Sequence, residues 1–142
     1  MRSLEQQIVD GAGEAIVFAD AAGTIRLWNA AAERMFGYPA AEAVGASLDL
    51  IVPEKHRPRH WEGYARVMRT GQTMYGGELL AVPAVRRDGS RISIEFTVTL
   101  VRDGDGAVQG IAALIRDVTA RRNADTKLRQ RVQELEQRSP EA

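Results

Sequence analysis

The chain has 142 residues, which is enough for one domain with its own hydrophobic core. Lysine plus arginine and aspartate plus glutamate number 19 each, so no net charge favours nucleic acid or a membrane surface as a partner. Cysteine is absent, which excludes disulfides, thiolate metal sites, cysteine nucleophiles and photoreceptor chemistry that needs a cysteinyl adduct.

No stretch of the chain approaches the length of a membrane span. The first residues carry glutamate and glutamine where a signal peptide needs an apolar run. We therefore expect a cytoplasmic protein, or a cytoplasmic piece of a larger one, with neither a membrane nor nucleic acid as its partner.

A short helix and a hairpin are expected first in chain order. Residues 3–10 predict a helix whose Leu4 and Ile8 share one face. Residues 14–20 and 24–28 predict two strands that are joined by a tight turn. Strands this short bury little by themselves, so we expect them to join later strands in one sheet.

Two short helices are expected next. Asn29 follows the second strand and can cap a helix over residues 30–36. Residues 39–44 predict another short helix, with Pro39 at its first position because proline lacks the N–H that would be unpaired there.

One long helix follows. It is expected to begin near Arg57 or Pro58, because Pro58 would break a helix begun earlier, and to end at Thr70 before Gly71. The side chains expected to face inward are Trp61, Tyr64, Ala65 and Met68, flanked by His60 and Val67.

Three strands complete the predicted sheet, and Asp-Gly turn signals separate them. Residues 78–87 include Pro83, which cannot donate to a strand ladder, so this strand is expected at a sheet edge or a bulge. In residues 91–102 apolar and polar side chains alternate, which predicts an antiparallel strand over a core. Residues 107–119 are apolar on both faces, which indicates a more central strand.

The chain after Thr119 is polar and helical, and residues 138–142 are expected to fray. Asp125 interrupts an apolar seam along this helix, so the seam indicates a coiled coil of only about two heptads. The seam consists of Val118, Leu128, Val132 and Leu135.

Several motifs stand in a fixed order along this pattern. They are residues 27–38 (LWNAAAERMFGY), 43–45 (AVG), 51–54 (IVPE), 86–90 (RRDGS) and 115–122 (IRDVTARR). Over residues 5–122 the chain thereby resembles a PAS domain of the bacterial sensory type. The resemblance implies an α+β fold, with a five-stranded antiparallel sheet in the order 2-1-5-4-3. Short helices and one long helix would cover one face, and flanking helices would stand at both ends.

The resemblance also implies a sensory and dimerisation module of bacterial signal transduction. Such domains read a small ligand, a cofactor or a partner, and pass a shift through a C-terminal helix to an output domain. We accordingly divide the chain into an N-terminal flanking helix (residues 1–12), the sensor domain (13–119) and a signalling helix with its tail (120–142). Asp117 and Thr119 match the Asp-x-Thr signalling corner of the family, and Asp117 can also cap the exit helix.

His60 is the sharpest candidate for a cofactor site. In the haem-binding branch of the family an axial histidine lies on the long helix, about eleven residues before the glycine that ends it, and His60 precedes Gly71 by this spacing. The resemblance therefore implies b-type haem on His60. The alternative is a packed or hydrogen-bonded histidine, as in many members of the family that bind no haem. The arginine that the family's oxygen sensors place over the iron is missing from residues 78–81.

The wall of the expected pocket is hydrophobic. Strand parity leaves the choice between Leu79 and Leu80, between Ile92 and Ile94, and between Ile111 and Leu114 open. We select Trp61, Tyr64, Leu80, Ile94 and Leu114 as the candidate wall. His56 and His60 are four residues apart, but Pro58 interrupts a helix between them and no third ligand is evident, so no metal is expected besides haem iron.

The chain contains no phosphate-binding loop, paired-carboxylate spacing, His-Glu-x-x-His or Gly-x-Ser-x-Gly motif, so we expect no catalytic activity in it. Two alternatives to a ligand sensor stay open: a ligand-free dimerisation or protein-interaction domain, and the regulatory fragment of a larger enzyme such as a histidine kinase or cyclase. The expected partners are a second copy, bound through the flanking helices, and a C-terminal output domain or partner protein.

Overall fold

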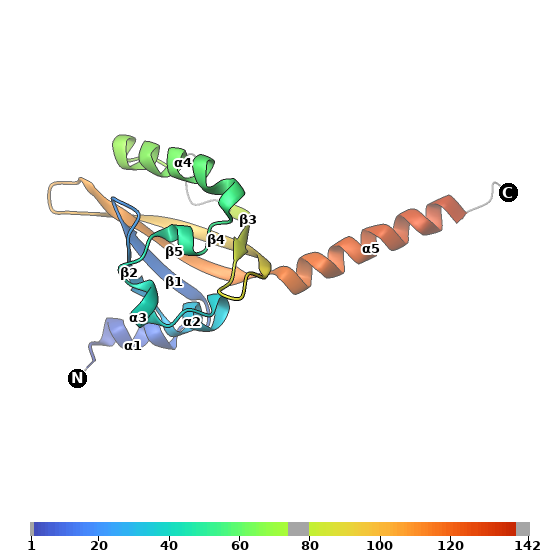
Figure 1. Ribbon diagram of the computed structural model, residues 1–142, viewed down its shortest axis with the longest axis horizontal. Coiled ribbons are helices and arrows are strands. Elements are labelled where there is room, and N and C mark those ends of the chain that lie inside the picture. Colours follow the sequence, from blue (N-terminus) through green and yellow to red (C-terminus); the bar gives the residue numbers. More distant parts are fainter. Residues whose placement is uncertain (1, 74–79, 139–142) are drawn as a thin grey trace.

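The computed structural model describes residues 2–73 and 80–138. Its strands form one antiparallel sheet in the spatial order β2-β1-β5-β4-β3 (Figure 1). This confirms the α+β fold and the order that the family resemblance implies. The strands are β1 (Ala15–Asp20), β2 (Ile25–Trp28), β3 (Leu80–Val85), β4 (Arg91–Arg102) and β5 (Val108–Asp117).

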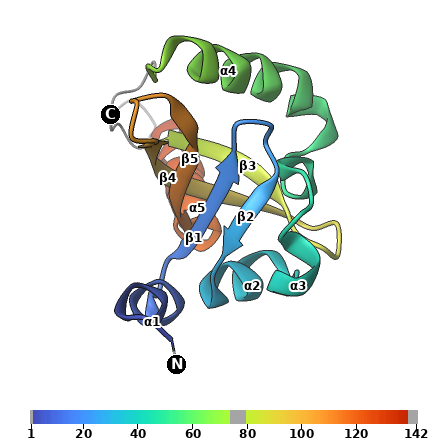
Figure 2. The same cartoon turned by 90° about the vertical axis from the view of Figure 1, so that its left-hand side faces the viewer.

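The helices lie at three places around this sheet. α2, α3 and α4 cover one face, α1 lies near α2 at one end, and α5 projects away from the domain (Figures 1 and 2). No helix among the described residues is long and apolar enough to cross a membrane. The helices are α1 (Leu4–Gly11), α2 (Ala30–Phe36), α3 (Ala40–Ala43), α4 (Arg57–Thr70) and α5 (Thr119–Arg138), with 3-10 turns η1 (Leu48–Leu50) and η2 (Glu54–His56).

The strand predictions are confirmed where residues are described. Pro83 lies in β3 at the edge of the sheet, and β5 is the central strand between β1 and β4. In β4 the predicted alternation buries Ile92 and Ile94 and leaves Arg91 exposed. Of the strand predicted over residues 78–87, the structure shows Leu80–Val85, and residues 78 and 79 lie outside the described part.

One helix boundary differs from its prediction. Pro39 is the residue before α3 and has extended backbone angles, so it is not the first helical residue. Its carbonyl oxygen accepts hydrogen bonds from the N–H groups of Glu42 and Ala43, each at 3.0 Å. Pro39 therefore lies one position before α3, where its carbonyl oxygen accepts the hydrogen bonds that close the first turn of the helix.

Asn29 connects the N-terminal elements, and its side chain is almost completely buried. Its Oδ1 accepts hydrogen bonds from the N–H groups of Ile16 (2.9 Å) and Ala32 (3.0 Å). Its Nδ2 donates to the carbonyl oxygens of Val9 (2.7 Å) and Glu14 (3.1 Å). The bond to Ala32 is the predicted helix cap, and the other three attach α1 and β1 to the same side chain.

We predict that Asn29→Ala lowers the free energy of unfolding by about 3 kcal/mol, because it removes the cap and leaves buried N–H and C=O groups unpaired. Urea denaturation followed by circular dichroism measures this loss. The matched control is Asn123→Ala on the exposed surface of α5, which should change stability by less than about 0.5 kcal/mol. Equal effects of the two variants would contradict the assignment.

Candidate functional site

Helix α4 is attached to the domain along one edge by two aromatic side chains. The indole of Trp61 packs directly on Gly23, where an added Cβ would lie only 2.2 Å from the ring, and its Nε1 donates to Asp49 at 2.7 Å. The hydroxyl of Tyr64 donates to the carbonyl oxygen of Asp20, and burial raises the pKa of Tyr64 to about 12. Both contacts hold this edge of α4 over the turn between β1 and β2.

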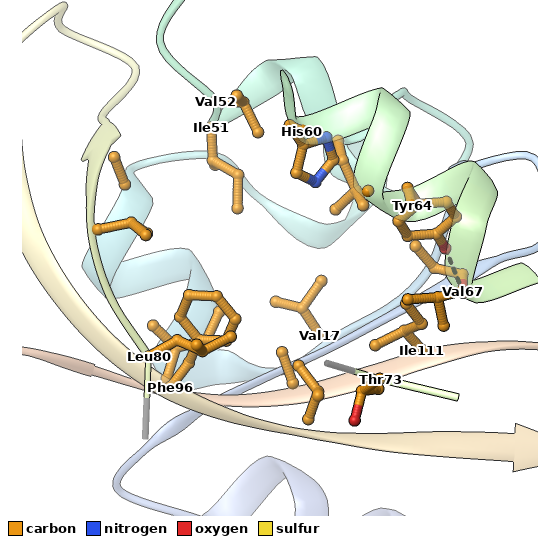
Figure 3. Close-up of a pocket in the computed structure, with 18 of the residues that line it drawn as sticks. Val17, Ile51, Val52, His60, Tyr64, Val67, Thr73, Leu80, Phe96 and Ile111 are labelled. Atoms are coloured by element: carbon orange, nitrogen blue, oxygen red, sulfur yellow. Dashed lines mark hydrogen bonds between the residues drawn. The ribbon is translucent and has the colours of Figure 1, made fainter. Parts of the chain in front are cut away.

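A cavity of about 600 Å³ lies between α4 and the sheet (Figure 3). The floor comes from inward-facing positions of β1, β4 and β5, and α4 forms the opposite wall. All the side chains that the strands contribute are hydrocarbon, so the cavity suits a mostly apolar ligand. The main lining residues are Val17, Ile51, His60, Tyr64, Val67, Leu80, Ile94, Phe96, Val98, Ile111, Ala113 and Ile115.

Four of the six predicted site residues meet at this cavity, namely His60, Tyr64, Leu80 and Ile94. Leu114 does not, because β5 directs it to the opposite face of the sheet, where it is 40% exposed. Its neighbours Ala113 and Ile115 and the alternative candidate Ile111 face the cavity instead. Because β5 has apolar residues on both of its faces, the sequence does not indicate which face is turned towards the cavity.

The predicted inward face of α4 also needs correction. Ala65 is exposed, and neither Trp61 nor Met68 lines the cavity. The cavity-facing side of the helix is rotated towards His60, Gly63, Tyr64 and Val67. The reason is that Trp61 packs on Gly23, which turns the helix by about one residue from the orientation predicted from apolar spacing alone.

Phe96 and Val98 are lining residues that sequence reasoning did not name. Both follow Ile94 at intervals of two in β4, so the alternation that placed Ile94 inward also places them inward. The spacing signal was thus present, but it could be used only once the parity of β4 was known.

The imidazole of His60 points into the cavity (Figure 3). Its ring stands edge-on to Trp61, with 4.7 Å between ring centroids, and its Nδ1 is buried with no hydrogen-bond partner among the described residues. Burial lowers the pKa of His60 below the ordinary value of 6.5, and the negative charge of Asp49 offsets only part of this. The cavity therefore contains a neutral imidazole, which can bind a metal centre or hydrogen-bond a ligand.

The predicted corner joins three elements through one compact set of hydrogen bonds. The carboxylate of Asp117 accepts from the backbone N–H and the hydroxyl of Thr119, at 2.9 and 2.6 Å. The Oγ1 of Thr119 in turn accepts from the N–H of Ser93 (2.9 Å), whose carbonyl oxygen accepts from Val118 (2.8 Å). The next residue after Ser93 is Ile94, so neighbouring residues of β4 face the corner and the cavity.

Comparison with known proteins places this geometry in context. A family model described as PAS fold matches residues 9–123. The sensor protein FixL of Bradyrhizobium diazoefficiens is 28% identical over 135 residues, which cover 95% of this chain and 26% of that protein. The oxygen sensor protein DosP of Escherichia coli is 30% identical over 95 residues, which cover 67% of this chain and 12% of that protein.

A solved structure supports the fold. The PAS domain of a protein from Colwellia psychrerythraea superimposes with a TM-score of 0.71 at 20% identity, over 82% of this chain and 95% of that one. The chain spans at most 26% of the length of the two curated relatives, which are therefore much longer proteins.

We predict that Asp117→Ala costs about 1 kcal/mol of stability and loosens α5 more than the sheet, because it removes the hydrogen bonds that start the helix. Amide hydrogen exchange should rise after Thr119 while β4 and β5 stay protected. Asp105→Ala, at an exposed turn, is the matched control and should leave both regions unchanged. Uniform loosening of the whole domain would show that Asp117 is instead an anchor of the core.

We also predict a pH dependence that arises from His60. Its pKa is lower in the folded chain than in the unfolded one, so the unfolded chain binds more protons as the pH falls below about 6.5. The free energy of unfolding should therefore fall between about pH 8 and pH 5, and fall less steeply in His60→Phe. Urea denaturation at each pH gives both curves, and parallel curves would contradict a buried neutral imidazole.

Proposed function

The chain belongs to the PAS family, and we propose that it senses a flat, mostly apolar ligand bound between α4 and the sheet. The domain is a sensory module of signal transduction, as in its relatives. The observation that carries the proposal is a neutral imidazole, His60, that faces a cavity of about 600 Å³ whose strand side chains are all hydrocarbon. A cavity of this size and polarity is typical of sites for small molecules and cofactors.

The ligand we propose is b-type haem, with His60 as its axial ligand. The residues fit this group, because the cavity of about 600 Å³ offers the imidazole of His60 beside the hydrocarbon side chains of the strands. Leu80 and Phe96 lie across the cavity from His60 and would exclude water from a bound ring (Figure 3). Bound haem supplies an iron centre that can take a diatomic gas on its open side.

Two features of the site favour weak binding of both haem and gas. An axial histidine normally donates its second ring N–H to a partner, and Nδ1 of His60 has none among the described residues. The side chains that the described strands turn towards the cavity also contain no hydrogen-bond donor, and the donors that line it, such as Arg59 and Gln72, come from α4 and the segment after it. We therefore expect weaker oxygen stabilisation than in the family's oxygen sensors.

We propose that the signal leaves through the corner formed by Asp117 and Thr119. A ligand that displaces Ile94 or Phe96 acts on β4, and Ser93 of the same strand is bonded to Thr119. In this proposal residues 13–119 are the sensor domain. Helix α1 is the flanking helix before it, and α5 is the output helix after it. The longer relatives support an output domain beyond α5, which would carry any catalysis.

The exposed helices support a homodimer. Leu4 and Ile8 of α1 and three apolar side chains of α5 are exposed to solvent, and α5 extends away from the domain (Figure 1). Each exposed stripe would be stabilised by contact with the same stripe of a second copy. This feature equally favours the alternative function, a dimerisation domain whose cavity stays empty.

Hemin titration tests the proposed cofactor. Wild type should develop a saturable Soret band, and His60→Ala should lose it because it removes the one imidazole that the described residues turn towards the cavity. His56→Ala is the matched control, since His56 does not line the cavity, and it should bind like wild type. Equal, weak absorbance in all three proteins would contradict haem binding and favour the packed-histidine alternative.

A further inference from the structure

Gly63 lies in the interior of α4, where a glycine weakens a helix. Glycine loses more backbone freedom on folding than alanine does, so a helix that holds it is less stable. Helix α4 also begins without a side-chain cap, because His56 forms no hydrogen bond of that kind. A glycine therefore stands in the middle of a helix whose stability would be raised by almost any other residue.

Neither backbone geometry nor packing among the described residues requires this glycine. Gly37 and Gly71 end their helices with positive φ angles of 85° and 69°, which side chains rarely adopt. A Cβ added at Gly110 would lie 2.1 Å from the carbonyl oxygen of Ala19. Gly63 has no positive φ, and a Cβ added to it meets no atom within 4 Å beyond its own stretch of helix. The space beside Gly63 is therefore open.

This open space belongs to the cavity. Gly63 is half-buried and lines the cavity together with His60 and Val67, which lie on the same side of α4 (Figure 3). At about 100° per residue, Gly63 stands on the helix between these two residues and Arg59 and Arg66, which are exposed and also line the cavity. Gly63 thus lies where the inward side of α4 gives way to the exposed rim.

A side chain at this position would extend towards His60. The Cα–Cβ bonds of an α-helix are tilted towards its N-terminus, so a side chain covers the turn before its own residue, and His60 is three residues before Gly63. Because Gly63 has no side chain, the helix backbone is bare beside the imidazole. A ligand bound to His60 has room to lie against this backbone and to extend past it to the rim.

We propose that Gly63 determines the specificity of the cavity, because it admits a flat, rigid ligand that lies across α4 beside His60 and contacts the helix backbone. The inference rests on the proposed function in taking the cavity as a ligand site with His60 in its wall. Departures from local stability rules are expected at functional sites, and here the departure makes room that is used only when the ligand is bound. Ala19 and Ala113 leave room from the side of the sheet.

Gly63→Ala tests the proposal because its two expected effects have opposite signs. In the empty protein it should lower the equilibrium constant of unfolding about threefold to fivefold, since alanine is the better helix former and its Cβ meets open space. It should also weaken hemin binding by about tenfold or more in a Soret titration. Unchanged hemin affinity, or a protein that is less stable to urea than wild type, would overturn the proposal.

Leucine at two positions of α4 gives the matched comparison. Gly63→Leu should abolish hemin binding, because its side chain fills the space beside His60. Ala65→Leu places the same side chain on the exposed part of the helix, outside the cavity, and should bind hemin like wild type. Equal loss of binding in both variants would show that α4 tolerates no added bulk, and would overturn the specificity role of Gly63.

A second probe distinguishes failure of this inference from failure of the proposed cofactor. If wild type binds no hemin, the cofactor is contradicted, and Nile red, a flat and uncharged apolar dye that needs no axial ligand, replaces it as the probe. Gly63→Leu should then lower dye uptake, as should Ala113→Leu, which fills the cavity from its floor, whereas Ala65→Leu should not. Dye uptake that is indifferent to Gly63→Leu would overturn the inference, and so would a wild type that takes up neither probe.

Discussion

The buried side chain of Asn29 is the interaction on which the arrangement of the domain depends. All four of its hydrogen-bonding positions are used, and they connect the end of α1, the start of β1 and the first turn of α2. A buried amide that is only partly paired is costly, so other arrangements of these three elements are disfavoured. The position of α2 then places Phe36, whose carbonyl oxygen accepts from Arg87 in the turn between β3 and β4. Through α2, the amide of Asn29 is thereby connected to the turn between β3 and β4.

The cavity results from two separate causes. Helix α4 is held at one edge, where Trp61 and Tyr64 contact the turn between β1 and β2. The rest of the helix therefore lies above the sheet without packing directly on it. The floor beneath it includes Ala19 and Ala113, whose side chains are small. Larger residues at these two positions would fill the space, so the opening is encoded by side-chain volume as well as by the fold.

The sequence could predict the sheet better than the contents of the cavity. Local chemistry decides that Pro83 lies at a sheet edge, how β4 alternates and what Asn29 caps, and these predictions agree with the structure. The errors at Trp61, Ala65 and Leu114 concern which way a side chain points. That direction depends on contacts between distant segments, such as the ring of Trp61 on Gly23. The spacing of apolar residues within one segment therefore cannot predict it.

The length of α5 gives small movements at the corner a large effect. The helix has 20 residues and is therefore about 30 Å long. A tilt of about 10° where Thr119 meets Ser93 would carry its far end sideways by about 5 Å, close to the rise of one helical turn. Shifts of a fraction of an ångström inside the domain, too small to alter its fold, are thereby enlarged by leverage into a displacement that a neighbouring helix can detect.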